Sequence, residues 1–293
     1  MVTLKSAEEA MVTRGTIAGA LIALERPELM DLFLTYQNEA LTARRFLDDS
    51  LMELDPEAEI LEVGGGILAL TVQLASEGFK VTAVEPVGEG FTGITFLMKI
   101  FSDIARQENL TFELVEARIE DCSFNRKFDF IFSINVMEHL KDPYSVLLQM
   151  VEILKHGGIY RFFCPNYDFP YEPHFGKWLF SRKDEAFYLD KKRAVTSVVS
   201  VDEALGLYRS LNYITLNKIM RFSRLNHVVI RANNDTTFNL LERAISDQEL
   251  QKRHPRLASI AKIIKISNMH YITKLFPKKY QPMLDITVSN LHP

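Results

Sequence analysis

Residues 59–70, "EILEVGGGILAL", place three consecutive glycines between a short apolar run and the start of a helix-like pattern. The run "EILEV" is typical of a buried strand, and "ILALTVQLASEG", residues 67–78, is typical of a helix. Glycine at a strand-to-helix turn lets the backbone approach a ligand with no Cβ in the way. The stretch therefore predicts a ligand-binding turn at the carboxyl end of a strand.

The same alternation of strand-like and helix-like runs continues along the chain. Strand patterns cover residues 80–85, 112–115, 128–133 and 158–163, and helical patterns cover 93–107 and 143–158. Gly78, Gly157 and Gly158 stand where left-handed helix C-caps are expected. This alternation predicts an α/β fold with a doubly wound, mostly parallel sheet.

The N-terminal region follows a different pattern, because it is helical without intervening strands. Leu29, Phe33, Tyr36 and Ala40 recur at helical spacing, and "DPEAE", residues 55–59, ends the pattern. We therefore expect residues 1–55 to form an N-terminal helical cap and the remaining residues, 56–293, to form the α/β domain.

Composition limits the classes of partner and compartment. The chain has 293 residues, 47% of them apolar, and a net charge of -4, which gives no general electrostatic reason to bind nucleic acid. Two cysteines cannot build a disulfide framework, and the N-terminus lacks the order of a secretory signal. The apolar stretch "GTIAGALIAL" is shorter than the roughly 20 residues that span a bilayer. We expect a cytoplasmic protein.

Two acids indicate the kind of ligand. Glu62 stands just before the glycines, where it would repel a pyrophosphate and attract an amino group, and the glycine spacing departs from the dinucleotide fingerprint G-x-G-x-x-G. Glu85 ends the next strand, where an acid can accept both hydroxyls of a ribose. The two positions together suit a nucleoside joined to an amino acid.

Two segments, "ILEVGGGILALTVQLASEGFKVTAVEP" and "FDFIFSINVMEHLKDPYSVLLQMVEILKHGGIYRFFCPN", give residues 58–166 a clear resemblance. The region resembles the class I S-adenosylmethionine (SAM)-dependent methyltransferases, especially those acting on small molecules. The resemblance implies a Rossmann-like, seven-stranded sheet, SAM as cofactor and S-adenosylhomocysteine as product.

The resemblance also assigns cofactor-binding residues. By this resemblance, the glycine turn would lie under the methionine part of SAM, with Glu62, Gly64, Gly65 and Gly66. The end of the second strand would bind the ribose through Glu85 and Pro86, and the loop after the third strand would bind the adenine through Arg118, Ile119 and Glu120. After the fourth strand, Asn135 would line the methyl-donor site.

Two positions depart from the family pattern. Leu68 occupies the place of the third glycine, so we expect the helix start to pack differently there. Arg118 stands where an aspartate often receives the adenine amino group, and an arginine cannot accept that hydrogen bond. We expect the adenine to be held by backbone, by Glu120, or by stacking on the guanidinium.

Methyl transfer needs alignment of the acceptor and exclusion of water, and it needs a base only if the acceptor carries a proton. His139, after the fourth strand, is a candidate base, or alternatively it orients its own turn. His174 is the second candidate base. Glu138 is interpreted as a solvated or capping acid. The spacing of Glu138, His139, Glu172 and His174 matches no metal motif, so no metal site is expected.

An aromatic segment, residues 164–181, follows the fifth strand. We expect it to form a lid over the substrate, with Tyr167, Tyr171, Glu172 and Trp178 as binding residues; the alternative is that its rings pack under the N-terminal helix. Cys164 is expected to be a buried, inert thiol.

The C-terminal third carries a helix-like run at 200–213 and a strand, "QPMLDITVSN", expected to close the sheet edge. Between them lies a helical insertion, residues 234–282, whose stretch 251–283 contains no acid. Its pattern places Leu257, Ile260 and Ile264 on one helix face. Residues 252–280 suit peripheral contact with an anionic membrane, or alternatively their apolar face packs on the domain.

The sequence thus predicts a SAM-dependent methyltransferase that moves a methyl group to an O, N or C atom of a small-molecule acceptor. Two alternatives stay open at this stage. One is a non-catalytic protein that binds SAM or a nucleoside as a sensor or complex subunit, and the other is an NAD-linked oxidoreductase.

Overall fold

A seven-stranded sheet forms the centre of the computed structural model, which describes residues 25–87, 92–175, 177–178, 201–246, 251, 255–267 and 269–290. The strand order is β3-β2-β1-β4-β5-β9-β8. Strand β1 pairs in parallel with β2 and β4, β2 pairs in parallel with β3, and β8 pairs antiparallel with β9. The strands are β1 Glu59–Val63, β2 Lys80–Val84, β3 Glu113–Val115, β4 Phe128–Ile134, β5 Leu154–Pro165, β8 Val229–Ala232 and β9 Met283–Ser289.

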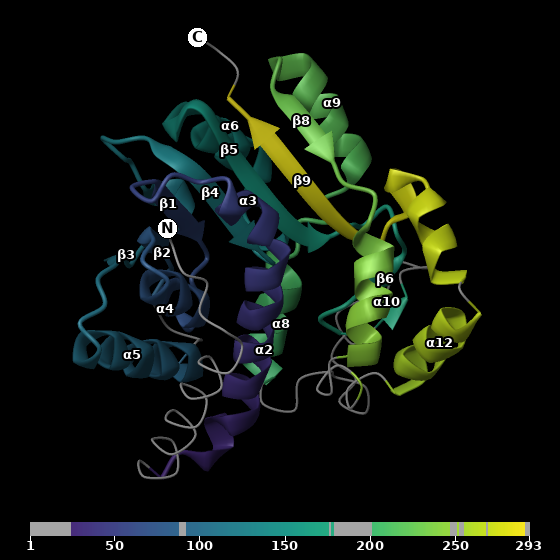
Figure 1. The fold of residues 1–293 in the computed structure, drawn as a ribbon, viewed down its shortest axis with the longest axis horizontal. Coiled ribbons are helices and arrows are strands. Elements are labelled where there is room, and N and C mark those ends of the chain that lie inside the picture. Colours follow the sequence, from purple (N-terminus) through teal and green to yellow (C-terminus); the bar gives the residue numbers. More distant parts are fainter. Residues whose placement is uncertain are drawn as a thin grey trace. The chain divides into compact units, whose positions relative to one another are not determined.

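Helices connect these strands, and Figure 1 shows α4 and α5 beside β2 and β3. The expected doubly wound, Rossmann-like fold is confirmed. The α-helices are α2 Met30–Phe46, α3 Asp48–Met52, α4 Ala69–Ser76, α5 Thr92–Gln107, α6 Pro143–Ile153, α8 Val201–Ser210, α9 Leu216–Asn226, α10 Thr236–Ser246 and α12 Pro255–Ile266. Short 3-10 turns are η1 Pro27–Leu29, η2 Ile119–Asp121, η3 Met137–His139, η4 Met269–Leu275 and η5 Lys278–Tyr280.

The chain divides into two compact units, each described by itself below. The described part of the first unit runs to Ile134 and includes Gln149–Tyr160. The second unit holds Asn135–Leu148 and the described chain from Arg161 onward. This division does not separate residues 1–55 from the rest, so the boundary at residue 55 between the helical cap and the α/β domain stays a prediction.

In the first unit, α2 packs on the parallel strands through two hydrophobic clusters. Phe33 lies in one cluster with residues of α4 and α5, and Leu47 lies in the other with Phe130 and Phe132 of β4. A buried ion pair adds to this packing, because Arg44 Nε donates to Glu77 at 2.8 Å. The helical part of the cap thus belongs to the same core as the strands.

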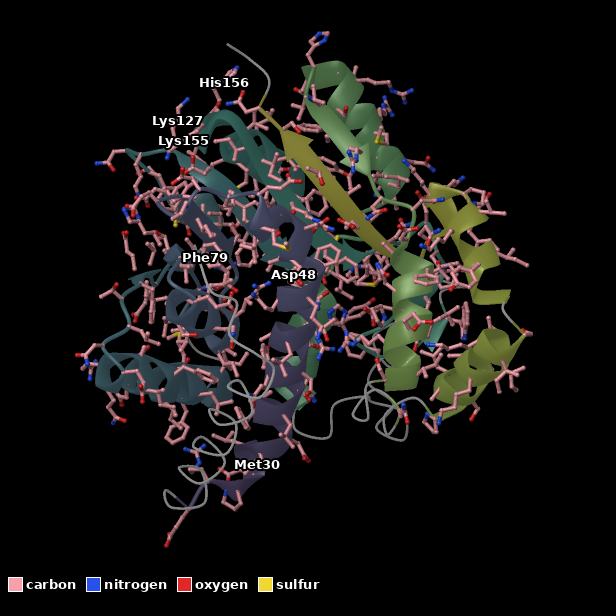
Figure 2. The ribbon with its side chains drawn as sticks, in the orientation of Figure 1. Met30, Asp48, Phe79, Lys127, Lys155 and His156 are labelled. Carbon is pink, nitrogen blue, oxygen red and sulfur yellow. The ribbon has the colours of Figure 1, made fainter. Side chains whose placement is uncertain are left out.

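Basic side chains gather at the other end of these strands. Lys155 Nζ donates to Asp129 at 2.7 Å, and Figure 2 shows Lys127, Lys155 and His156 close together. Asp129 also accepts the backbone N–H of Glu59, the first residue of β1. These charges therefore lie at the amino end of the strands, opposite the glycine turn.

Of the three glycines expected to cap helices, only Gly78 does so. Gly78 has a φ of +95° directly after α4, and the N–H groups of Gly78 and Phe79 donate to carbonyls of the last helical turn, which confirms the expected C-cap. The same expectation for Gly157 and Gly158 is wrong. Helix α6 already ends at Ile153, and both glycines lie inside β5, where a Cβ on Gly158 would meet the carbonyl oxygen of Asp129 at 2.9 Å.

The expectation that the last strand closes the sheet edge is also wrong. Strand β9 lies between β5 and β8, and β8, which the sequence pattern did not reveal, forms the edge. In the second unit a buried pair supports β9, because the Arg161 guanidinium of β5 donates to both carboxylate oxygens of Asp285 at 3.1 Å. Figure 1 shows β8 beside β9.

The insertion between β8 and β9 is helical, as expected. Leu257, Ala261 and Ile264 of α12 pack against α10, whereas Ile260 is 53% exposed, so the predicted face is corrected at that position. In the described part of the chain, no helix is both long and apolar enough to cross a membrane.

Candidate active site

The glycine turn after β1 is fastened to the end of β2. The N–H groups of Gly64 and Gly65 both donate to the carbonyl oxygen of Val84, at 2.8 and 3.2 Å. Gly64 and Gly66 have φ values of +83° and +54°, a region that side chains rarely adopt. A Cβ on Gly66 would lie 3.1 Å from the ring of Tyr36 in α2. The turn thus needs its glycines for conformation and for space.

Glu85 lies at the carboxyl end of β2, where the sequence predicted a ribose-binding acid. Its Oε2 accepts the N–H of Gly66 at 2.8 Å. Burial raises the pKa of Glu85 to about 7, and the bond from Gly66 partly opposes this. Pro86 follows directly and is exposed. One carboxylate oxygen is thereby oriented by the glycine turn.

Glu62 is buried in β1, and its Oε2 accepts the Thr71 hydroxyl of α4 at 2.5 Å. Burial raises the pKa of Glu62 to about 8; the Thr71 bond lowers it, and the charge of Glu85 raises it further. A buried acid of this kind is stabilised by a cationic partner. The two acids and the glycine turn therefore fit a ligand with an ammonium group and vicinal hydroxyls, as SAM has.

Leu68, at the place of the family's third glycine, adopts a glycine-like conformation. Its φ is +65° and ψ is +16°, and its side chain is fully buried in the cluster with Phe33 and Val72. A left-handed conformation costs a branched residue about 1–2 kcal/mol. Burial of the leucine side chain offsets that strain, which explains how the helix start packs without the glycine.

The expected adenine loop forms the 3-10 turn η2. Ile119 is buried, Arg118 is exposed, and Glu120 is half-buried. Gln149 holds the turn by donating to the carbonyls of Ile119 and Cys122 at 3.1 and 2.8 Å.

A hollow of about 340 Å³ lies nearby, along β3 and the loop that connects β3 to β4 in the sequence. It is lined by Glu113, Val115, Ala117 and residues 121–126, and by none of the residues predicted to bind the cofactor. Its position gives no support to those assignments, which rest on the turn geometry instead.

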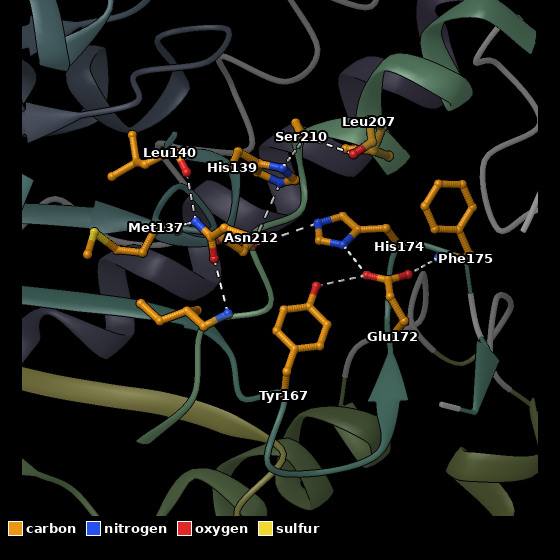
Figure 3. A network of polar contacts seen from close by, with 12 residues as sticks. Met137, His139, Leu140, Tyr167, Glu172, His174, Phe175, Leu207, Ser210 and Asn212 are labelled. Atoms are coloured by element: carbon orange, nitrogen blue, oxygen red, sulfur yellow. Dashed lines mark hydrogen bonds and ion pairs between the residues drawn. The ribbon is translucent and has the colours of Figure 1, made fainter. Parts of the chain in front are cut away.

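In the second unit, the segment after β4 forms a tight turn that several hydrogen bonds hold in place. Asn135 has a φ of +55°, which asparagine tolerates, and its N–H donates to Phe163 of β5 at 2.8 Å. The Asn212 amide donates to the carbonyls of Met137 and Leu140 at 2.7 and 2.9 Å. Asn212 thus fixes the turn η3, which carries Glu138 and His139 (Figure 3).

Both candidate bases lie in this region and face one another. The ring centroids of His139 and His174 are 5.0 Å apart, and each Nε2 lies 3.8 Å from Oε1 of Glu138. The interpretation of Glu138 as a solvated acid is wrong, because its side chain is fully buried. Burial, followed by the charge of His174, lowers the pKa of His139 to about 3, so its ring is neutral at physiological pH.

The other ring nitrogens are bonded to neighbours. His139 Nδ1 lies 2.9 Å from Ser210 Oγ, and His174 Nδ1 lies 2.5 Å from Glu172 Oε1. The buried Glu172 also accepts the Phe175 N–H at 2.7 Å and the Tyr167 hydroxyl at 3.2 Å. Figure 3 shows these bonds as one network, which sets the orientation of both rings.

The four predicted substrate residues separate into two pairs. Tyr167 and Glu172 belong to the histidine network, and burial raises the pKa of Tyr167. Tyr171 packs edge-on against Trp178 at 5.2 Å within a small antiparallel pair, β6 Tyr171–Glu172 and β7 Lys177–Trp178. The predicted lid also includes residues 176 and 179–181, which lie outside the described residues.

Cys164 is buried, and burial raises the pKa of its thiol, in agreement with an unreactive cysteine.

The sequence did not point to the roles of Tyr36, Thr71, Ser210 and Asn212 at the site. Each is a common polar or aromatic residue in a helix or loop, and its role depends on a contact with another element, which a linear pattern does not reveal.

A family model described as a methyltransferase domain matches residues 33–199, more than half of the chain. The chain belongs to the class I SAM-dependent methyltransferase family. Membership of this family sets aside the NAD-linked oxidoreductase and favours an enzyme over the non-catalytic alternative.

Individual relatives are similar over different lengths. An uncharacterised protein of Mycobacterium tuberculosis is 37% identical over 266 residues, which is 90% of this chain and 89% of that protein. A ubiquinone biosynthesis O-methyltransferase of Rickettsia canadensis is 27% identical over 101 residues, 34% of this chain and 40% of the relative. The solved plantazolicin methyltransferase BpumL covers 96% of each chain at 12% identity and a TM-score of 0.48.

We predict that Leu68→Gly destabilises the protein although glycine is the family's residue there. Removal of the buried side chain should cost about 2–5 kcal/mol in either Leu68→Gly or Leu68→Ala. Glycine also removes the left-handed strain, so it should be the milder change by about 1 kcal/mol. Urea unfolding of both variants and the wild type measures this order. An alanine variant as stable as the glycine variant would contradict a strained Leu68.

Proposed function

We propose that this methyltransferase binds SAM at the carboxyl ends of β1 and β2 and methylates a small-molecule acceptor. The observation that carries the proposal is the pair of acids at adjacent strand ends, the buried Glu62 and the half-buried Glu85, with the Gly66 N–H donating to the second. Glu62 would attract the ammonium group of the methionine part, and Glu85 would accept the ribose hydroxyls.

Bound SAM supplies an electrophilic methyl group on a sulfonium sulfur, with S-adenosylhomocysteine as the product. The chain's own residues then have to align the acceptor and exclude water. As the groups that act on the acceptor we propose His139 and His174, whose Nε2 edges face the buried Glu138. Nitrogen atoms of this kind can receive a proton or hold an oxygen ligand, which favours an acceptor with an O–H or N–H group.

The aromatic segment supports a small-molecule acceptor. Tyr167 and Glu172 extend the histidine network, and the edge-on pair of Tyr171 and Trp178 offers a partly exposed aromatic wall on the same segment. Pockets for small organic molecules are commonly lined this way, with few polar groups among aromatic ones.

We predict that the protein binds SAM and S-adenosylhomocysteine in the micromolar range and that Glu85→Ala abolishes this binding. The substitution removes the acceptor of the ribose hydroxyls and of the Gly66 N–H. Calorimetric titration measures the affinity, and Glu152→Ala, at an exposed glutamate of α6 away from the predicted cofactor residues, serves as a control. Absence of heat with both ligands, or full affinity in Glu85→Ala, would contradict the proposed cofactor site.

We further predict that the affinity for SAM rises between pH 6 and 8. The pKa values of about 8 for Glu62 and about 7 for Glu85 mean that both acids bind protons at pH 6 in the ligand-free protein. A cationic ligand requires the ionised forms, so binding at low pH has to release protons. Calorimetry at pH 6.5 in buffers of different ionisation enthalpy counts them. Glu62→Gln should flatten the rise, and an affinity that falls over this range would contradict the assignment.

We also propose that the basic helical insertion contacts anionic membranes peripherally. Along α12, Ile260, Ile263 and Ile266 are 53%, 67% and 84% exposed, at helical spacing, in a stretch without acids. Leu275 in η4 is exposed as well. Exposed apolar side chains surrounded by lysines complement a negatively charged lipid surface.

We predict that the protein co-sediments with phosphatidylcholine vesicles containing about 30% phosphatidylserine, and not with neutral vesicles, because lysines need anionic headgroups. Ile263→Glu should abolish co-sedimentation. Leu225→Glu, which changes an equally exposed leucine of α9, is the matched control and should bind like the wild type. Equal loss in both variants, or binding to neutral vesicles alone, would contradict an electrostatic contact at α12.

A further inference from the structure

Three side chains of the second unit converge on one point. The ligand atoms of Glu138, His139 and His174 all lie within 4.8 Å of one another, and among the described residues they form a group able to hold a metal ion. Each Nε2 is 3.8 Å from the same oxygen, Oε1 of Glu138. Two histidines and one carboxylate on one side of an ion are a common ligand set for divalent transition metals.

The hydrogen bonds determine the tautomer of His139. The Ser210 hydroxyl donates its proton to the carbonyl oxygen of Leu207 at 2.7 Å. It can therefore only accept from His139 Nδ1, which lies 2.9 Å away. The Nδ1 atom thus carries the proton, and the Nε2 atom of the neutral ring directs its lone pair toward Glu138.

The same reasoning applies to His174. Its Nδ1 lies 2.5 Å from Glu172 Oε1, and Glu172 also accepts the Phe175 N–H at 2.7 Å. Glu172 is surrounded by donors and acts as an acceptor, so His174 Nδ1 donates to it. A histidine that donates its distal N–H to a carboxylate is the usual outer-shell arrangement of a metal ligand.

The neutral His139 ring therefore presents a lone pair toward one buried carboxylate oxygen, Oε1 of Glu138, and the Nε2 atom of His174 faces the same oxygen. Lone pairs and a carboxylate repel one another unless a cation or proton lies between them. We infer that Glu138 Oε1, His139 Nε2 and His174 Nε2 hold a divalent transition-metal ion such as Zn²⁺. Ligands of zinc lie about 2.1 Å from the ion and hence at most about 4.2 Å apart, so the side chains would close slightly around it.

What the metal ion would do to the acceptor rests on the proposed function. In this arrangement the two histidines are ligands of the metal ion and do not act as bases. A further ligand position would take a hydroxyl of the acceptor and lower the pKa of that hydroxyl. The proton then leaves to solvent, the new O–CH₃ bond forms as the S–CH₃ bond breaks, and sulfur keeps the electron pair as a thioether. Nothing is oxidised or reduced. The substrate class is therefore a hydroxylated small molecule.

The test is zinc binding by the full chain after removal of metal with a chelator. Calorimetry with Zn²⁺ alone should give a single tight equivalent for the wild type, and Glu138→Gln and His174→Ala should each weaken it at least tenfold. Glu172→Gln, which removes only the outer-shell acceptor, should weaken it by about 10–100-fold. His156→Ala, at an exposed histidine of the first unit, is the matched control and should bind zinc like the wild type.

A Co²⁺ titration of the wild type supplies a second readout that does not depend on any variant folding. Visible ligand-field bands of tetrahedral or five-coordinate cobalt, displaced by Zn²⁺, would support the site. Zinc binding that is absent in the wild type, or unchanged in a His139→Ala, His174→Ala double variant with a cooperative melt, would overturn it. SAM titration of the metal-free protein tests the residues of the proposed cofactor site separately, so the two proposals can fail independently.

Discussion

The shared acceptor at the end of β2 is the constraint on which the glycine turn, and with it the proposed cofactor site, depends. The Val84 carbonyl receives two N–H groups of the glycine turn, and Glu85 receives the third. The turn after β1 therefore cannot move without breaking bonds to β2. The parallel register, with Glu62 opposite Ala83 and Val63 opposite Val84, then sets the two acids at neighbouring strand ends. The positions of both acids follow from backbone bonding, and their chemistry follows from burial.

In the second unit, a side chain holds the turn after β4 in place. The turn that carries Glu138 and His139 is too short to satisfy its own carbonyls, and the Asn212 amide bonds two of them while the Asn212 N–H bonds a third. Ser210, in the adjoining residues, orients the His139 ring. One segment, residues 210–212, thus determines both the backbone and the ring direction at this turn.

The sequence was sufficient where a local pattern carries the information. Alternating periodicity predicted the parallel sheet, and the pattern placed the glycine turn and the two acids at the ends of neighbouring strands. It failed where contacts join distant segments. The burial of Glu138 and its approach to His174 depend on the packing of the chain, and linear spacing gave no metal motif although three of those residues lie together. Strand β8 was missed because its four residues, Val-Ile-Arg-Ala, do not alternate between apolar and polar types, although they alternate between exposed and half-buried in the structure.

The raised pKa values of Glu62 and Glu85 connect stability with binding. A carboxyl group whose pKa is higher in the folded protein contributes stability below its unfolded pKa and loses that contribution as pH rises through the folded value. Near neutral pH, the ligand-free protein therefore pays for keeping both acids buried at the ends of β1 and β2. A cationic, hydroxylated ligand recovers this cost, because it supplies the charge and donors that burial removed. The strain at Leu68, in the same turn, is offset by the packing of its buried side chain, which needs no ligand.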